Sequence, residues 1–298
     1  MFSRPRFVLI QLNLLLVLGL VSCGSLFGTR ATPTPTGPTA TPIPPTATPV
    51  PAAATVNGET LPVSEFQSQL AEYKSAQTAL GKTVDEQDAT KTVLEDLIAQ
   101  MLLAQSAKSE GFVLTDSALQ SRLSALTTQV GGADKMAAWE SSHGYTDATF
   151  RIDLKRSAEA AWMRDKIITA VPITADQVHV QQILLYNAGD AQNVLNQLQG
   201  GSDFGTLAAK IDPVTNGELG WFPKGYLLDP KIEEAAFSLQ VGQVSGVIQT
   251  AAGFSIIKVL ERDAQHPLTP DAHLALQDLA LKDWITQQRT KAVVVLAP

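Results

Sequence analysis

The side chains that could perform chemistry in this chain are few, and their spacing excludes most classes of enzyme. There is one cysteine, Cys23, and there are four histidines, at positions 143, 179, 266 and 273. The histidines do not show the short spacings at which metal ligands recur. The sequence also lacks the Gly-x-Ser-x-Gly elbow of a serine hydrolase and a phosphate-binding glycine loop. We therefore expect no metal site and no cofactor, and a function that needs neither.

Three separated blocks between Val178 and Glu261 carry most of the functional signal. The first is Gln182-Ile183-Leu184-Leu185, and the second is Asp203-Phe204-Gly205-Thr206-Leu207-Ala208 followed by Gly217-Glu218-Leu219-Gly220-Trp221-Phe222. The third runs from Ala235-Ala236-Phe237-Ser238-Leu239 through Gly242-Gln243-Val244-Ser245 to Gly253-Phe254-Ser255-Ile256-Ile257-Lys258-Val259. In order and spacing these blocks resemble the parvulin-type peptidyl-prolyl isomerases. The resemblance implies a four-stranded sheet flanked by helices over residues 173–263.

The resemblance also implies three polar site residues. Gln182 stands where the family has its first histidine, Ser255 where it has its second, and Asp212 where it has an Asp or a Cys. Gln and Ser can form hydrogen bonds, but they lack the proton equilibrium of imidazole near neutral pH. Asp212 lies five residues before Gly217, a shorter gap than the family usually has, and the proline after it is equally typical of a turn. His179 is no substitute, because side chains alternate along a strand and His179 points away from Gln182.

Four apolar residues are implied to bind the proline ring of a substrate. Leu219, Leu228 and Phe237 match apolar positions of the family, and Ile232 replaces an aromatic residue; Phe237 is also compatible with a core position. Rotation about an X-Pro bond crosses a barrier of about 18–20 kcal/mol and needs no nucleophile, only a pocket that favours the twisted amide. Because Gln182 and Ser255 replace the two histidines of the family, we expect a site that binds peptides and isomerises them slowly or undetectably. The alternative is an inactive chaperone or scaffold that keeps the fold for binding.

The first residues predict export and attachment to a membrane. Arg4 and Arg6 precede an apolar run, which indicates a signal peptide over residues 1–22. Leu20-Val21-Ser22-Cys23-Gly24 resembles the bacterial lipobox, whose cysteine receives lipid. Residues 23–53 are then the lipidated cysteine and a spacer, whose Thr/Pro-rich tract from Thr29 to Pro51 could extend up to roughly 60–70 Å at about 3.1 Å per residue. We expect an extracytoplasmic lipoprotein that is anchored to the membrane by lipid on Cys23.

Residues 54–172 show the pattern of a helical domain. An Asn57-Gly58 pair predicts an opening hairpin, and Ser64 with Gln67 predicts a capping box at the first helix. A further helix is expected from about Glu86 to Ser109. This layout resembles the chaperone domain of SurA-like and PrsA-like extracytoplasmic foldases.

The last segment, residues 264–298, predicts a helix followed by a β-branched run. By the same resemblance we expect it to return to the helical domain and to pack there through Leu281, Trp284 and Ile285. The fold class is therefore α+β, with the parvulin-like domain inserted into a helical domain.

The charge pattern bears on the partners. The net charge is −7 with 17% charged residues, and no cluster of Lys and Arg occurs. We therefore expect no nucleic acid partner, and the partners implied by the resemblance are unfolded or proline-containing exported polypeptides.

Overall fold

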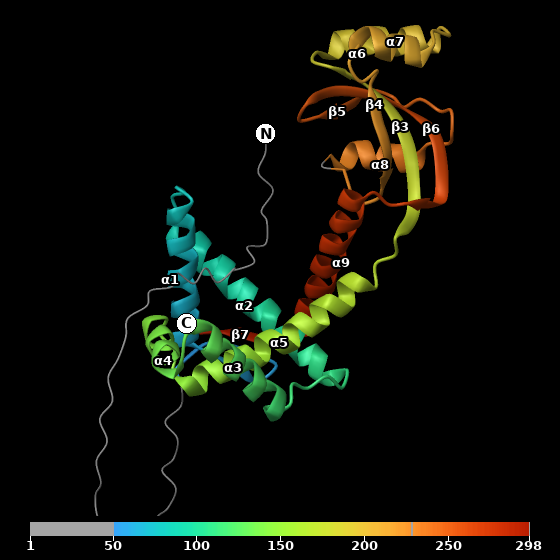
Figure 1. The fold of residues 1–298 in the computed structure, drawn as a ribbon. Helices are drawn as coiled ribbons and strands as arrows, with labels where there is room; N and C mark the ends of the chain where they lie inside the picture. The colour runs from blue at the N-terminus through green and yellow to red at the C-terminus, as the bar shows by residue number, and fades with distance from the viewer. Residues whose placement is uncertain (1–50, 228, 298) are drawn as a thin grey trace, which may run out of the picture.

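The computed structural model describes residues 51–227 and 229–297, which form a helical part and a sheet part (Figure 1). The chain passes from the helical part to the sheet part near Ile173 and returns near Leu268. These two crossings are bonded to each other, since the amide of Leu268 donates to the carbonyl of Ile173 over 2.8 Å. The predicted signal peptide, Cys23 and the first part of the spacer lie outside the described residues.

The helical part is built mainly from long amphipathic helices. They are α1 (Val63–Ala79), α2 (Glu86–Ser109), α3 (Asp116–Val130), α4 (Ala133–Ser142), α5 (Asp147–Thr169) and α9 (Pro270–Lys291). The prediction of α2 is confirmed. The predicted capping box of α1 is wrong, because the helix begins at Val63, two residues earlier than a cap at Ser64 requires, and no side chain caps it. The short helix α4, between two glycines and His143, was not anticipated.

A small antiparallel sheet closes the helical part. The predicted hairpin is confirmed as β1 (Ala52–Val56) and β2 (Glu59–Pro62), and its turn residues Asn57 and Gly58 have φ values of 52° and 84°, as a two-residue hairpin turn requires. The C-terminal strand β7 (Val294–Leu296) pairs with the other edge of β1, in the order β2-β1-β7. The two ends of the described chain therefore share one sheet.

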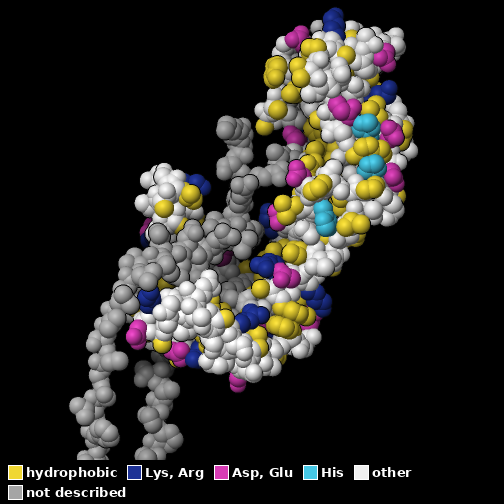
Figure 2. Space-filling model, in the orientation of Figure 1, with side chains coloured by type: hydrophobic (Ala, Val, Ile, Leu, Met, Phe, Trp, Pro, Cys, Tyr) yellow, Lys and Arg dark blue, Asp and Glu magenta, His cyan; other side chains and the backbone are white. Residues whose placement is uncertain are grey.

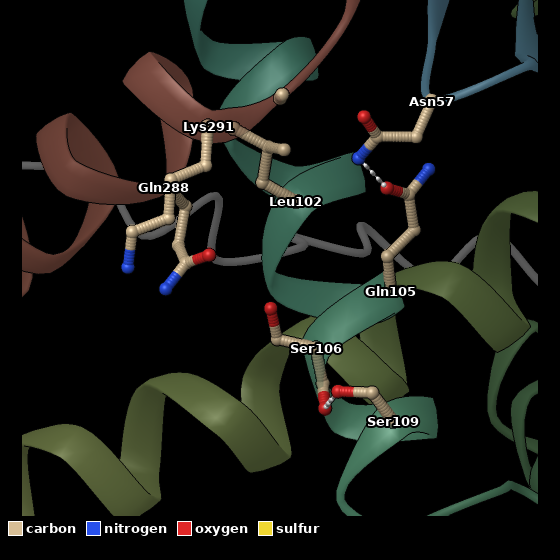
Figure 3. Close-up of a pocket in the computed structure, with 8 residues that line it drawn as sticks. Asn57, Leu102, Gln105, Ser106, Ser109, Gln288 and Lys291 are labelled. Atoms are coloured by element: carbon tan, nitrogen blue, oxygen red, sulfur yellow. Dashed lines mark hydrogen bonds between the residues drawn. The ribbon is translucent and has the colours of Figure 1, made fainter.

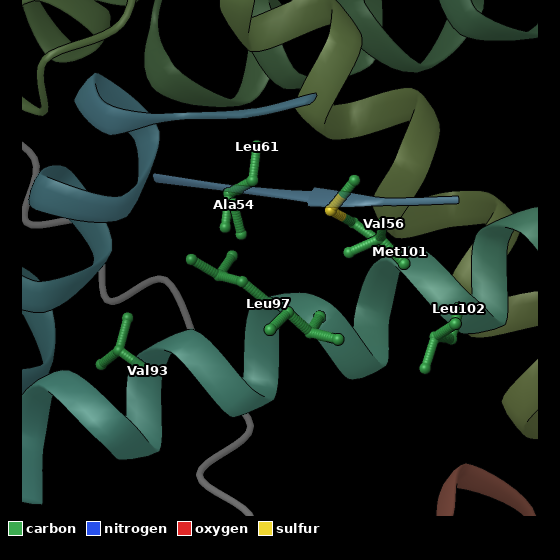
Figure 4. Packing of buried hydrophobic residues seen from close by; sticks show 8 residues of the cluster. Ala54, Val56, Leu61, Val93, Leu97, Met101 and Leu102 are labelled. Atoms are coloured by element: carbon green, nitrogen blue, oxygen red, sulfur yellow. The ribbon is translucent and has the colours of Figure 1, made fainter. Parts of the chain in front are cut away.

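The core beneath this sheet is shared with α2. Ala54, Val56 and Leu61 of the hairpin face Val93, Leu97 and Met101 of the helix (Figure 4). Fully burying one such aliphatic side chain stabilises a fold by about 1.5–3 kcal/mol. The hairpin is therefore held by packing against the helix as well as by its own ladder.

Helix α9 returns to the helical part as expected. Leu281 is 8% exposed and packs in one cluster with Leu103 and Ala107 of α2 and Met163 of α5. Trp284 and Ile285 are partly buried against the same cluster, so the expectation for all three residues is confirmed.

The sheet part has four antiparallel strands in the order β4-β3-β6-β5. The strands are β3 (Thr174–Leu185), β4 (Glu218–Pro223), β5 (Ile248–Thr250) and β6 (Gly253–Pro267), and the helices are α6 (Ala188–Gln199), α7 (Phe204–Ile211) and α8 (Pro230–Ser238). Strand β6 continues beyond residue 263, the expected limit of this domain, to Pro267.

The two faces of this sheet carry different helices. Val178, Val180 and Ile257 pack with Ile232 and Ala236 of α8, whereas Ile183 and Ile256 pack with residues of α6 and α7. Figure 1 shows the α6–α7 pair at the end of the sheet part farthest from the helical part and α8 closer to α9. The expected α+β fold, a helical part with a four-stranded parvulin-like sheet, is confirmed. Across residues 51–227 and 229–297, no helix combines the length and the apolar character that a membrane span requires.

Candidate functional site

Gln182 and Ser255 meet across the ladder between β3 and β6. Gln182 pairs with Ile257 and Leu184 pairs with Ser255, so Gln182 and Ser255 are diagonal neighbours on the face that carries α8. Nε2 of Gln182 donates to Oγ of Ser255 over 2.8 Å. Ser255 is fully buried while Gln182 is half-buried. The serine thus orients the glutamine amide, and the glutamine is the member of the pair that a ligand can reach.

Asp212 shapes the loop that follows α7. Its Oδ1 accepts from the amides of Val214 and Thr215 over 3.1 and 3.2 Å, and its Oδ2 accepts from the Thr215 hydroxyl. The Thr215 hydroxyl, together with these amides, holds the pKa of the Asp212 carboxyl below its usual range. The carboxylate is therefore ionised and engaged with its own turn, which is the arrangement expected of a turn former.

This loop is fastened to β3 beside Gln182. The Gln182 amide donates to the carbonyl of Gly217 over 2.7 Å, and Nε2 of Gln181 donates to the carbonyl of Asn216 over 2.7 Å. Gly217 has φ +73°, and a Cβ on it would lie 2.0 Å from the carbonyl oxygen of Gln182. Only glycine fits this contact, so the Gly217 position helps to fix where the polar residues lie.

Two of the predicted apolar residues lie on the face that carries Gln182. Ile232 is 5% exposed and belongs to the cluster of Val180 and Ile257, and the half-buried Leu219 packs against that cluster. Together they form an apolar wall on the Gln182 face. Leu228, the fourth residue predicted for this wall, lies outside the described residues.

Phe237, the third predicted apolar residue that the structure describes, packs against the same cluster. Its ring meets that of Phe222 edge-on at 6.2 Å, and Phe222 pairs with Val178. Lys224 and Arg262 also lie over the Phe237 ring, at 5.2 and 5.7 Å. The structure therefore joins Gln182 to Ser255 and gathers Leu219, Ile232 and Phe237 in one apolar cluster on the same face of the sheet.

A stack of three rings occupies the opposite face of the sheet. Trp221 stacks on His266 at 4.0 Å and on His179 at 5.4 Å, and Nε2 of His179 lies 2.6 Å from a carboxylate oxygen of Glu218. Figure 2 shows histidines gathered with acidic and hydrophobic side chains on the visible surface of the sheet part. The prediction that His179 points away from Gln182 is confirmed. The stack itself was missed, since Trp221 and His266 become neighbours only through the pairing of β3 with both β4 and β6.

The helical part contains a polar hollow of about 230 Å³ where the hairpin turn meets α2 and the end of α9 (Figure 3). Asn57 and Gln105 line one side of it, joined by a 2.9 Å hydrogen bond, and Gln288 and Lys291 line the other. Within the part of the chain that the structure describes, no three His, Cys, Asp or Glu side chains are grouped so as to hold a metal ion.

Two family models match the chain. The PPIC-type PPIASE domain matches residues 187–261, and the SurA-like N-terminal domain matches residues 46–136. The first match covers most of the four-stranded sheet part, although it begins after Gln182. The second covers the hairpin and the helices up to α4.

Individual relatives agree with these domains. The foldase protein PrsA of Caldanaerobacter subterraneus subsp. tengcongensis is 29% identical over 223 residues, covering 68% of this chain and 71% of the relative. The chaperone SurA of Methylobacillus flagellatus is 31% identical over 144 residues, covering 41% of this chain and 33% of the relative. A solved structure of the peptidylprolyl isomerase PrsA from Bacillus cereus is 22% identical, with 78% of this chain and 83% of that chain covered and a TM-score of 0.42. The two family models and the sequence relatives identify the chain as a parvulin-type relative of the PrsA and SurA foldases, with a SurA-like N-terminal domain and a PPIC-type PPIase domain.

Proposed function

We propose that this protein is a lipid-anchored, extracytoplasmic folding factor that binds proline-containing or unfolded segments of exported proteins at the α8 face of its four-stranded sheet. The observation that carries the proposal is the Gln182–Ser255 hydrogen bond of 2.8 Å, set beside the apolar wall of Leu219 and Ile232. An apolar wall with one oriented amide suits a proline ring and the amide bond next to it.

The reaction proposed for this site is isomerisation of an X-Pro bond, accelerated by the environment of the bound peptide and without a covalent step. The twisted amide in the transition state loses C–N double-bond character, and it is less disfavoured where water is excluded and a hydrogen-bonding group is already oriented. Gln182 supplies that group, because its Nε2 carries two N–H donors, of which Ser255 takes one, and the X-Pro bond, which has no N–H of its own, can only accept. Neither residue titrates near neutral pH, so the rate does not depend on the protonation state of these two side chains. We expect turnover to be slow compared with that of a site that carries two histidines.

The proposed anchor is lipid on Cys23. It is supported by the apolar run from Phe7 to Leu20 and by the lone cysteine that follows it. Each buried CH₂ of an acyl chain contributes about 0.8 kcal/mol to membrane binding, so two or more chains give stable attachment. The Thr/Pro-rich residues up to 53 would then separate the folded part from the lipid surface.

The first experiment measures the cis–trans exchange rate of short Xaa-Pro peptides with the full chain, by exchange NMR without a coupling protease. Leu219→Asn removes part of the apolar wall, and Leu274→Asn is the matched control, since Leu274 is 57% exposed on α9. Acceleration that is lost in Leu219→Asn and kept in Leu274→Asn supports isomerisation at this face. If the protein neither accelerates exchange nor binds peptide at the sheet, the proposal is contradicted.

A second candidate is a chaperone that holds clients without isomerising them. One observation favours it. Ser255 is fully buried and its hydroxyl accepts the hydrogen bond from Gln182, so of these two residues only Gln182 is accessible to a ligand. Peptide resonances that shift on binding without faster exchange would select this candidate.

A further inference from the structure

A second cavity, of about 360 Å³, opens far from the sheet between α3, α4 and α5. Each helix contributes side chains three or four residues apart, such as Ser124 and Thr127 of α3 or Met136 and Glu140 of α4. Residues at this spacing lie on one face of a helix. The cavity is thus formed by three facing helical surfaces.

The cavity has an apolar floor and a hydroxyl-bearing side. Leu123 and Met136 line it while being only 5% and 7% exposed, and both belong to the core of this part of the molecule. Ser124 and Thr127 lie along α3 above that floor. Such a lining suits a ligand with an apolar stem and a polar end.

The charges around the cavity do not cancel. Nε of Arg151 donates to Asp147 over 2.7 Å, and its Nη1 donates to Oε1 of Gln120 over 2.9 Å, so this cation is already paired. Glu140 is 7% exposed as a whole residue, and its carboxylate oxygens keep some access to the cavity while accepting no hydrogen bond from residues 51–227 and 229–297. Burial, followed by repulsion from Asp147, raises the pKa of Glu140, and the nearby Arg151 opposes this rise. One carboxylate of a largely buried residue, open to the cavity, is left without a hydrogen-bond partner beside a matched ion pair.

We propose that this cavity binds a lysine side chain of an unfolded client polypeptide, with the ammonium at Glu140 and the aliphatic stem on Leu123 and Met136. A carboxylate that is largely withdrawn from water and has no partner is costly, and a cation that donates to it reduces that cost. Lysine fits because it carries a compact charge with three donors on a four-carbon stem that can lie on apolar surface. The proposal rests on the proposed function to the extent that the client is an unfolded chain. It names a second contact for that client, separate from the proline site.

The test compares two labelled, unstructured peptides that contain no proline and differ at one residue, lysine in the first and Nε-acetyl-lysine in the second. Acetylation keeps the stem and removes the charge. Binding to the full chain is measured by fluorescence anisotropy, and its position by amide chemical shifts. We expect the lysine peptide to bind at least fivefold more tightly and to shift the amides of Ser124, Thr127 and Glu140.

Glu140→Gln is the informative variant, because it keeps the volume and the buried position while removing the charge. Asp134→Asn is the matched control, since it removes one negative charge from the exposed first turn of the same helix. We expect Glu140→Gln to abolish the preference for lysine over acetyl-lysine and Asp134→Asn to preserve it. Equal losses in the two variants would show general attraction to an acidic surface and would overturn the proposal.

The shift map of the unmodified protein decides the matter even if a variant fails to fold. Lysine-dependent shifts confined to the sheet, or none at all, would overturn the lysine site. Shifts at α3 and α4 without any effect of Xaa-Pro peptides at Gln182 would support the lysine site while the proposed proline site fails. The two failures are therefore distinguishable.

Discussion

The side-chain amide of Gln182 donates a 2.8 Å hydrogen bond to the hydroxyl of Ser255, joining β3 to β6 at the two positions where the parvulin resemblance places histidines. The pair keeps a hydrogen-bonded connection between these strands but contains no group that titrates near neutral pH. Whether such a pair still supports isomerisation is a question that substitutions can answer.

Restoring both histidines, as Gln182→His with Ser255→His, should raise the isomerisation rate. Hydrogen bonds that contribute about 1–3 kcal/mol to the transition state correspond to roughly a five- to 150-fold gain. Exchange NMR on Xaa-Pro peptides measures this gain, and Gln249→His on the exposed edge strand β5 is the control that should change nothing.

The same double variant carries a structural cost that must be measured beside the rate. Ser255 is fully buried, so a larger ring there overpacks the site and should lower stability by about 1–3 kcal/mol. A thermal melt establishes that the variant is folded. A folded double variant with no gain in rate would contradict the assignment of these two positions to the site.

Gly217→Ala should destabilise the sheet part and weaken peptide binding together. Gly217 has φ +73°, and its added Cβ would meet the carbonyl oxygen of Gln182 at 2.0 Å, so the loop must move away from β3. A left-handed backbone conformation alone costs a non-glycine residue about 1–3 kcal/mol, and the contact adds to it. Denaturant unfolding measures the loss, and Gly246→Ala, where a Cβ meets open space, should be nearly neutral.

Asp212→Asn should affect stability at neutral pH more than in acid. The Thr215 hydroxyl and the loop amides lower the pKa of this carboxyl in the folded state. A lowered carboxyl pKa contributes stability that is present above the ordinary value of about 3.9 and is lost as the pH falls through the folded value. The difference in melting temperature between the variant and the unmodified protein should therefore shrink below about pH 4. A large fall in isomerisation rate with an intact fold would instead indicate a catalytic role for Asp212.

Glu140→Gln should stabilise the folded protein at neutral pH, in contrast to Asp212→Asn. Burial raises the pKa of Glu140, so its ionised form disfavours the fold above that pKa and its protonated form does not. The gain in melting temperature should diminish as the pH falls through the raised folded value and vanish below the ordinary value. Binding of the lysine peptide should weaken over the same range, since it needs the carboxylate. Calorimetry and anisotropy at matched pH values check both effects, and a melting temperature that falls in the variant at neutral pH would contradict the prediction.

Local patterns in the sequence predicted much of the fold because they act within a few residues. The Asn57-Gly58 turn needs only two residues that tolerate positive φ, and the span of α2 follows from its capping residue Asp85 and its apolar spacing. The capping box expected at Ser64 failed for a related reason, because the strand before it runs directly into the helix after Pro62.

The sequence by itself determined the family, the α+β class and the candidate positions Gln182, Ser255 and Asp212, since these depend on residue order and spacing. The tertiary structure decided which of those residues meet. It joined Gln182 to Ser255, engaged Asp212 with its own turn and packed Phe237 edge-on against Phe222. It also created the ring stack of His179, Trp221 and His266 and left Glu140 buried beside a cavity. These relationships depend on strand register and helix packing between segments far apart in the chain, and no spacing along the sequence encodes them.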